Sequence, residues 1–96
     1  MVVIRVSWMY LLVVYDVGDI TRLNKVHKFL KTYLHWRQNS VFEGEISRAQ
    51  FNAIKTGLKE IIDETSDSII IYRLPNKNYL SIDIIGIEKN PIEFIL

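Results

Sequence analysis

The sequence contains no cysteine, so disulfide bonds, thiolate metal sites and cysteine nucleophiles are all excluded. It has only two histidines, His27 and His35, and neither is spaced as a metal ligand from the other or from a pair of carboxylates. We expect both histidines at the surface or in a groove. The absence of cysteine also fits a cytoplasmic protein.

Long apolar runs are missing as well. The most apolar stretch, residues 1–14, is interrupted by Arg5 and Ser7 and leads into a polar turn instead of a small-residue cleavage site. Neither a signal peptide nor a membrane span is therefore predicted. A clean strand pattern follows Met9, so residues 1–8 are either an extension upstream of the true start or an addition to the first strand.

The chain is short, and its 96 residues, 49% of them hydrophobic, leave room for one compact core. We therefore expect residues 1–96 to form a single domain. A domain of this size buries only roughly 60 to 70% of the surface that its unfolded chain exposes. A second chain that covered part of the remaining apolar surface would add stability, so the length favours an oligomer.

The net charge is only +1, but the charges are unevenly distributed. Residues 20–41 carry five basic side chains and no acidic one, whereas residues 42–67 carry six acids and three bases. The basic segment could meet a phosphate backbone. Alternatively, its charges form a solvated helix face that acids elsewhere in the fold compensate. The five basic residues are Arg22, Lys25, Lys28, Lys31 and Arg37.

The first part of the chain predicts a strand followed by a helix. Residues 10–17 form an apolar, β-branched run before Gly18, which is typical of a strand buried on both faces. Asp16 then lies at the carboxyl end of this strand, an unusual place for a carboxylate. Thr21 is the expected N-cap of the helix. The apolar positions of the helix recur at helical spacing and are Leu23, Val26, Leu30 and Tyr33.

The middle of the chain predicts two short strands and a second helix. Residues 35–46 are typical of extended structure with a kink at Asn39 and Ser40. Ser47 and Gln50 match a capping box, in which each side chain bonds the backbone amide of the other residue. The apolar stripe of the second helix consists of Phe51, Ile54, Leu58, Ile61 and Ile62.

Two further strands are predicted after an acidic loop at residues 63–67. Residues 68–74 are β-branched and end at Pro75, and residues 80–87 form a final strand. The order strand, helix, two strands, helix, strand is the pattern of an α+β, ferredoxin-like βαββαβ fold, here with an additional C-terminal strand. Such a surplus strand needs an edge to pair with, and a partner subunit can provide it.

Three features, read together, carry a resemblance to a known family. They are the run MYLLVVYD from Met9 to Asp16, the spacing from there to Arg22, and QNSVFEGE from Gln38 to Glu45, which is the most specific. These features resemble the small CRISPR-associated dimeric endonuclease family, a family of CRISPR-associated endoribonucleases that act beside the CRISPR integrase in spacer acquisition. The resemblance covers nearly all of residues 9–87.

The resemblance implies a ferredoxin-like homodimer in which the C-terminal strand and tail, here residues 79–96, are exchanged with the partner. It also implies association with the CRISPR integrase and a nuclease, dependent on Mg²⁺ or Mn²⁺, that acts on RNA or double-stranded DNA. The essential carboxylate of the family corresponds to Asp16, the implied catalytic residue and metal ligand. The implied nucleic-acid-binding residues are Tyr15, Arg22, Lys25, Arg37, Ser40 and Phe42.

Two positions depart from the family pattern. Some members have an arginine where this chain has Trp36, whereas Arg37 stands one position later. In a strand, a shift by one position reverses the face to which a side chain points. A second basic residue of the first helix corresponds either to Lys25 or to Asn24.

Several of these residues also have a structural alternative. Asp16 and Asp19 could form a turn or cap a helix beside Gly18. Tyr15 and Phe42 stand at strand positions where aromatic rings more often belong to a core or an interface. The sequence leaves these alternatives open.

Hydrolysis of a phosphodiester needs an activated water and neutralisation of the phosphate charge, and Mg²⁺ or Mn²⁺ supplies both. Because each chain supplies only Asp16, two copies facing each other across a twofold axis would hold one ion. The function that the resemblance implies is a metal-dependent endonuclease of CRISPR adaptation and a dimeric scaffold for the CRISPR integrase. The alternatives are a non-catalytic dimeric DNA-binding adaptor and a related toxin-type endoribonuclease.

Overall fold

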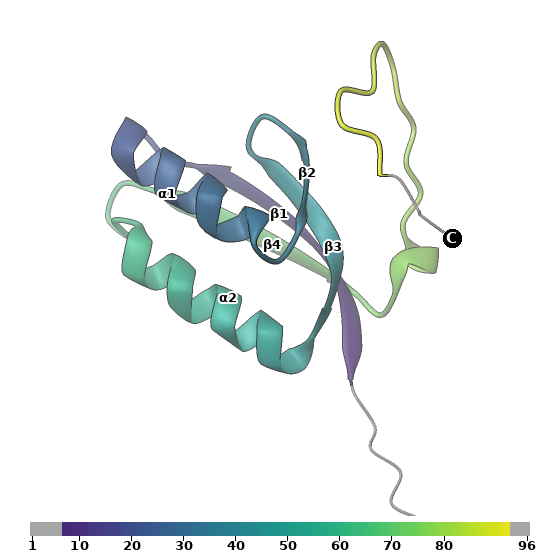
Figure 1. The fold of residues 1–96 in the computed structure, drawn as a ribbon, viewed down its shortest axis with the longest axis horizontal. Helices are drawn as coiled ribbons and strands as arrows, with labels where there is room; N and C mark the ends of the chain where they lie inside the picture. The colour runs from purple at the N-terminus through teal and green to yellow at the C-terminus, as the bar shows by residue number, and fades with distance from the viewer. Residues whose placement is uncertain (1–6, 93–96) are drawn as a thin grey trace, which may run out of the picture.

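The computed structural model describes residues 7–92, in which two α-helices pack on a four-stranded sheet (Figure 1). The helices and strands follow the predicted order. They are β1 (Trp8–Asp16), α1 (Ile20–Lys31), β2 (His35–Gln38), β3 (Val41–Ser47), α2 (Arg48–Ile61), β4 (Ser68–Leu74) and the short 3₁₀ helix η1 (Lys77–Tyr79).

The four strands form one antiparallel sheet in the order β2-β3-β1-β4. Both α-helices lie on the same face of this sheet (Figure 1). We call the opposite face the open face. This strand order and helix placement are those of the ferredoxin-like βαββαβ fold, so the predicted fold class is confirmed.

β1 lies inside the sheet because its residues are apolar on both faces. It pairs with β3 on one side and with β4 on the other. Its alternate residues Leu11, Val13 and Tyr15 point under the helices and are buried. The core that they form with the helices and β3 also contains Val26, Leu30, Phe42, Ile46, Ile54 and Leu58.

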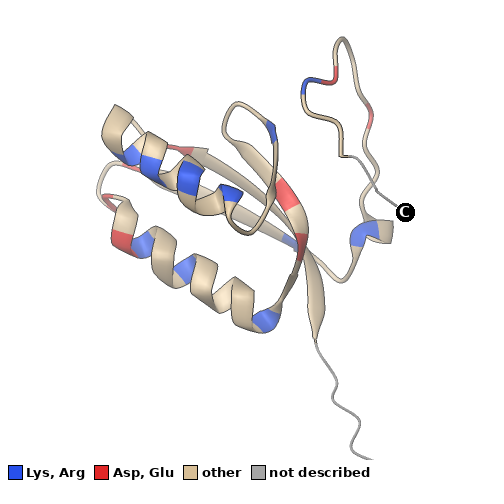
Figure 2. Ribbon diagram, in the orientation of Figure 1, with Lys and Arg blue, Asp and Glu red and all other residues tan. Residues whose placement is uncertain are grey.

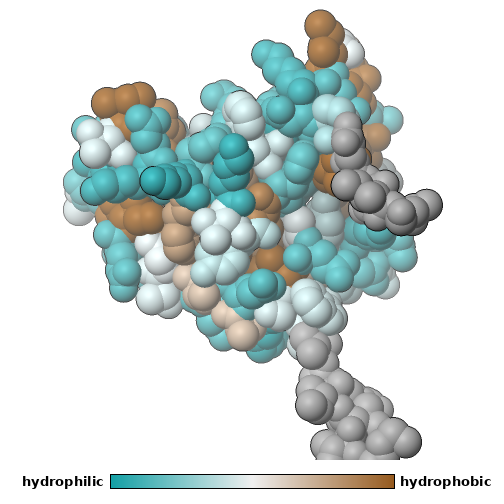
Figure 3. Space-filling view, in the orientation of Figure 1, coloured by the Kyte–Doolittle hydropathy of each residue, from teal (hydrophilic) through white to brown (hydrophobic). Residues whose placement is uncertain are grey.

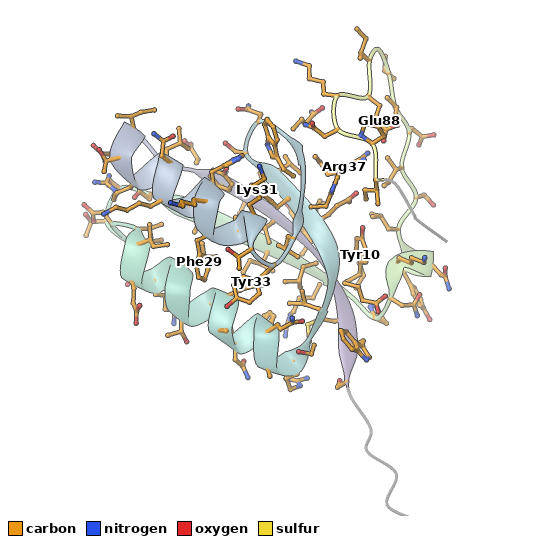
Figure 4. The ribbon with its side chains drawn as sticks, viewed as in Figure 1. Tyr10, Phe29, Lys31, Tyr33, Arg37 and Glu88 are labelled. Carbon is orange, nitrogen blue, oxygen red and sulfur yellow. The ribbon has the colours of Figure 1, made fainter. Side chains whose placement is uncertain are left out.

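The two helices contact each other where Gly57 of α2 faces the ring of Phe29 of α1. A Cβ atom at residue 57 would overlap this ring, so a larger residue would force Phe29 to move, which glycine avoids although it weakens a helix. Figure 4 shows Phe29 between the two helices. The glycine thus sets how closely α2 approaches α1 over the sheet.

The helix ends follow local hydrogen bonding, with one correction to the sequence prediction. The N-cap of α1 is Asp19 and not Thr21, because the extended backbone of Asp19 lets its carboxylate accept from the backbone N of Arg22 at 2.9 Å. Thr21 already lies inside the first turn. The predicted capping box of α2 is confirmed, with Ser47 N donating to Gln50 Oε1 at 2.9 Å and Gln50 N to Ser47 Oγ at 3.2 Å.

Trp8 belongs to the sheet, and Ser7 before it makes a backbone hydrogen bond to the start of α2. Trp8 pairs with Ser47 of β3, and the carbonyl oxygen of Ser7 accepts from the backbone N of Arg48 at 3.1 Å. Trp8 therefore adds a residue to the first strand. The rest of the segment considered as an extension, residues 1–6, lies outside the described residues.

No strand forms in the described C-terminal segment, residues 80–92. The segment leaves the sheet after η1 (Figure 1), and Figure 3 shows hydrophobic surface on this part of the molecule. Several of its isoleucines are exposed, and Ile85 is 97% exposed. The additional strand predicted at residues 80–87 is thus not formed within a single chain, because extended backbone becomes a strand only against a neighbouring edge. No helix of residues 7–92 is long and apolar enough to cross a membrane.

Candidate active site

Asp16 ends β1 as an exposed residue, in register with Ser68 of β4. The strand alternation places it on the open face, opposite to Tyr15. Within residues 7–92 its carboxylate makes no hydrogen bond or ion pair. Since Asp19 caps α1, the alternative of Asp16 as the helix cap is excluded, and its carboxylate is free for a ligand.

Arg22 is held by a carboxylate from a distant part of the chain. Its Nε donates to Asp67 Oδ2 at 2.8 Å and its Nη2 to Asp67 Oδ1 at 3.3 Å, a bidentate pair. The Asp67 side chain is fully enclosed. Two hydrogen bonds lower the pKa of Asp67 to about 2. The larger effect comes from the Arg22 side chain, and the next from the backbone amide of Asp63. Arg22 therefore binds an internal acid in this subunit, and its contact with phosphate remains a prediction.

Tyr15 and Phe42 form part of the core. Phe42 is 0% exposed and Tyr15 is 5% exposed, with their rings stacked at a centroid distance of 6.2 Å. Burial raises the pKa of the Tyr15 hydroxyl, while a hydrogen bond with Ser40 acts in the opposite direction. Within this subunit the two rings face the core, and the contact of Tyr15 and Phe42 with nucleic acid remains a prediction. Ser40 is half-buried, and its carbonyl oxygen accepts from Tyr15 N at 3.1 Å.

The two histidines have different surroundings. His27 is half-buried in α1, with its ring edge-on to Trp36 and to Phe42 at centroid distances of 5.0 and 5.1 Å. His35 is also half-buried, and its Nε2 lies 2.9 Å from the carbonyl oxygen of Asn90 in the C-terminal segment. His27 thus packs within the aromatic cluster, and His35 contacts the C-terminal segment.

Lys25 is exposed on α1, as are the neighbouring basic residues Lys28 and Lys31. Figure 2 shows basic positions in blue spaced along α1, with further basic positions on α2. Among residues 7–92, none of the three lysines forms an ion pair with an acid. This row is therefore the part of the predicted basic surface that stays available to a phosphate backbone.

Arg37 is the extra residue of a bulge between β2 and β3, where Trp36 pairs with Phe42 and Gln38 with Val41. Trp36 packs against the core, whereas Arg37 lies on the open face. Its Nε is 3.1 Å from Glu43 Oε1 and its Nη1 is 2.8 Å from Glu88 Oε1 (Figure 4).

Arg37 therefore joins the sheet to the C-terminal segment. Its Nη1 also donates to the carbonyl oxygen of Asn90 at 3.2 Å, and Asn90 Nδ2 donates to the carbonyl oxygen of Arg37 at 3.0 Å. As with Arg22, the guanidinium is occupied within the subunit. Its contact with nucleic acid remains a prediction.

Glu43 is a buried acid that the sequence reasoning did not single out. It is only 2% exposed, and its Oε1 has no hydrogen bond of good geometry although Arg37 Nε lies close. Burial raises the pKa of Glu43. The positive charges of Arg37 and His35 oppose this rise, and the negative charge of Glu88 adds to it. Burial also raises the pKa of the adjacent Tyr10, with Glu43 adding to it. A glutamate inside the apolar context of Val41, Phe42 and Ile46 was the available signal.

A groove of about 400 Å³ separates the open face from the C-terminal segment. Its sheet side is lined by Leu12, Val41 and Glu43, and its other side by residues 80–85 and 87–89. The groove does not include Asp16. The carboxylates of Glu43 and Asp16 thus belong to two separate places on the open face.

The residues fit a divalent cation only in part. Residues 7–92 contain no group of three or more histidine, cysteine, aspartate or glutamate side chains that could hold a metal ion. Asp16 is a free, exposed hard ligand, but the nearby Asp67 is occupied by Arg22. One subunit therefore contributes a single carboxylate ligand at this position.

Comparisons with known proteins agree with this architecture. The family model described as CRISPR associated protein Cas2 matches residues 9–82. The CRISPR-associated endoribonuclease Cas2 of Pyrococcus furiosus is 59% identical over 88 residues, which are 92% of this chain and 100% of that protein. The protein of the same name from Methanocaldococcus jannaschii is 50% identical over 92% of this chain and 76% of its own length.

Two solved structures are also similar. A crystal structure of cas2 is 52% identical, with a TM-score of 0.81, and covers 94% of this chain and 100% of its own. Cas2 of Streptococcus pyogenes is 38% identical, with a TM-score of 0.72, and covers 80% of this chain and 99% of its own. The fold of the chain is thus shared with solved members of one family.

The buried Glu43 generates a prediction on stability. Because its pKa is raised in the folded state, the native protein binds the proton more tightly than the unfolded chain does. The contribution of Glu43 to the free energy of unfolding is therefore largest below pH 4.5 and is lost as the pH rises through the raised pKa. As the pH is increased through this range, we expect the free energy of unfolding of Glu43→Gln to increase relative to that of wild type, measured by urea unfolding at successive pH values.

The control is Glu60→Gln, which replaces an exposed glutamate of α2. The comparison isolates burial, because both variants make the same chemical change. A difference between Glu43→Gln and wild type that stays constant with pH would contradict the assignment.

Proposed function

The chain belongs to the family of CRISPR associated protein Cas2, and from this premise we propose that it is a metal-dependent endonuclease of CRISPR adaptation that works as a homodimer. The observation that carries the proposal is the free carboxylate of Asp16 at the end of β1. Every other predicted polar site residue except Lys25 is engaged within the subunit or half-buried. Asp16 is therefore the residue to which the chemistry is assigned.

Asp16 would hold Mg²⁺ or Mn²⁺, since both ions prefer oxygen ligands. When bound, the ion supplies an activated water and neutralises charge on the phosphate. A single carboxylate is too few ligands, so the proposal pairs Asp16 of one subunit with Asp16 of its partner across a twofold axis. The dimer is then part of the active site.

The homodimer is supported by apolar surface that one subunit leaves uncovered. β4 is an edge strand, paired only with β1 among the described strands. A groove of about 370 Å³ runs beside it and includes the apolar side chains of Ile62, Ile69 and Ile71. Exposed isoleucines in the C-terminal segment provide matching apolar side chains. They are Ile82, Ile84, Ile85 and Ile87.

The proposal places the C-terminal segment, residues 79–96, on the sheet of the partner. An edge strand with unpaired backbone groups accepts a strand from another chain, and the pairing also covers apolar surface. This exchange gives residues 80–87 the neighbouring edge that they lack within one chain. It accounts for the difference between the predicted strand and the single subunit.

The substrate is proposed to be RNA or double-stranded DNA. The relatives from Pyrococcus furiosus and Methanocaldococcus jannaschii are named endoribonucleases, which supports RNA. The exposed row of Lys25, Lys28 and Lys31 supports contact with a phosphate backbone without sequence preference. The proposal places the protein in the cytoplasm, where these nucleic acids are found.

A second candidate function is a non-catalytic dimeric adaptor that holds DNA and bridges subunits of the CRISPR integrase. The observation that favours it is the engagement of Arg22 and Arg37 by internal acids, which leaves a lysine surface but few groups for chemistry. The two roles are compatible, because a dimer can bind DNA with or without cleavage. The third alternative, a toxin-type endoribonuclease, has no supporting observation among the relatives described above.

Cleavage should depend on Asp16. We expect Asp16→Ala to lose Mg²⁺- or Mn²⁺-dependent cleavage down to the level measured with a chelator, on RNA and on duplex DNA alike. Glu60→Gln, which changes an exposed acid on α2, should cleave as wild type does. If Asp16→Ala and wild type cleave equally in matched preparations, the proposed active site is wrong.

The lysine row should determine the salt dependence of DNA binding. A plot of log affinity against log salt concentration has a negative slope, and each lost phosphate contact makes this slope less steep by about 0.9. We expect the triple variant Lys25→Gln, Lys28→Gln, Lys31→Gln to show a less steep slope than wild type on duplex DNA, measured by fluorescence anisotropy.

The matched control is Lys55→Gln with Lys59→Gln, which removes charge from α2 instead of α1. This control should keep the slope of wild type. An unchanged slope in the triple variant would show that α1 does not contact the backbone.

A further inference from the structure

We propose that Asp67 is a positioning residue that fixes the backbone around Asp16, and that Arg22 acts through Asp67 and not on the substrate. The consequence for cleavage rests on the proposed function, whereas the positioning itself does not. Asp67 lies immediately before β4 and far from Asp16 in the sequence. Its side chain is nevertheless fully enclosed next to the turn that follows Asp16.

The Asp67 carboxylate collects N–H donors from three segments. Its Oδ2 accepts from Arg22 Nε at 2.8 Å and from the backbone N of Asp63 at 3.0 Å. Its Oδ1 accepts from Arg22 Nη2 at 3.3 Å and from the backbone N of Gly18 at 3.4 Å. One carboxylate thus ties the β1–α1 turn, the first turn of α1 and the loop before β4 together.

These contacts fix the backbone on both sides of Asp16. Asp16 itself is in register with Ser68, the residue directly after Asp67. The amide of Gly18, two residues beyond Asp16, donates to the Asp67 carboxylate. On the other side, Tyr15 N donates to the carbonyl oxygen of Ser40 at 3.1 Å. The backbone around Asp16 is therefore held by hydrogen bonds to β4, to the loop before β4 and to the turn between β2 and β3.

The position of the Asp16 carboxylate depends on this backbone alone. Within residues 7–92 the carboxylate makes no side-chain bond that could orient it. Two carboxylates that share one ion must both lie within a fraction of an ångström of the required place. A residue that fixes the turn therefore acts on the site without touching it.

The same contacts argue against Arg22 as a phosphate ligand. If Arg22 turned to a phosphate, the enclosed Asp67 carboxylate would keep its charge but lose both hydrogen bonds from the guanidinium. The carboxylate would keep only its bonds from two backbone amides, and the loss of a bidentate, charge-assisted pair by an enclosed carboxylate is unfavourable. Asp19 Oδ2 also lies 3.9 Å from Arg22 Nη1, which adds a second acid on the same guanidinium.

The test compares Asp67→Asn with Asp63→Asn in the full-length dimer. The substitution Asp67→Asn keeps the shape of the side chain but removes the charge and one acceptor oxygen. Asp63 lies in the same loop, yet its side chain accepts hydrogen bonds from Thr65 instead of from Gly18 or Arg22. We measure amide hydrogen exchange by NMR and, on the same samples, kcat and KM for cleavage with Mn²⁺.

For Asp67→Asn we expect faster exchange at the Gly18 amide, unchanged exchange in the middle of β1, and a kcat lowered by roughly 10 to 100-fold with KM unchanged. Asp63→Asn should retain the Gly18 exchange rate, kcat and KM of wild type. Arg22→Gln serves as the second variant, should Asp67→Asn not fold. It should lower kcat and leave KM unchanged, and combining it with Asp67→Asn should add little.

Three results would overturn the inference. Wild-type exchange at Gly18 in folded Asp67→Asn would show that Asp67 does not hold the turn. Faster exchange with an unchanged kcat would show that the turn does not position Asp16. A raised KM in Arg22→Gln would show that Arg22 contacts the substrate. If wild type does not cleave, the proposed function fails, and the exchange at Gly18 alone decides whether Asp67 holds the turn.

Discussion

The pairing of β1 with β3 on one side and with β4 on the other is the constraint on which the rest of this structure depends. It makes β1 an inner strand, so its alternate residues supply the core beneath the helices. It also places Asp16 where the sheet ends, beside Ser68 and within reach of the loop that carries Asp67. The exposed carboxylate is thus positioned by a strand that is paired on both sides.

Local patterns in the sequence were sufficient to predict most of the architecture. Hydrophobic periodicity gave the order of strands and helices, and the Ser47–Gln50 capping box marked the start of α2. The N-cap of α1 was assigned to Thr21 because several residues before that helix can cap it, and only the backbone geometry selects Asp19. The strand at residues 80–87 was not found within one chain, since its formation depends on an edge that local sequence does not specify.

The ion pairs around the candidate site could not be predicted from local sequence, because they join residues far apart in the chain. Arg22 and Arg37 both resembled phosphate ligands, yet they bind Asp67 and the pair Glu43 and Glu88. No local pattern shows which acid a folded chain brings to a basic residue. The place of Asp16 at the end of β1 was predictable because a carboxylate at the end of an apolar strand is visible locally. The burial of Glu43 was missed because the groove beside the distant C-terminal segment encloses it.

The central claim is that two subunits share one metal ion through their Asp16 carboxylates, and the most direct test is the stoichiometry of Mn²⁺ binding. Isothermal titration calorimetry, with the oligomeric state of the same sample determined by analytical ultracentrifugation, gives ions bound per chain. The account predicts one Mn²⁺ per two chains in a dimer and loss of this binding in Asp16→Ala. One ion per chain, or the same binding in Asp16→Ala, would contradict it.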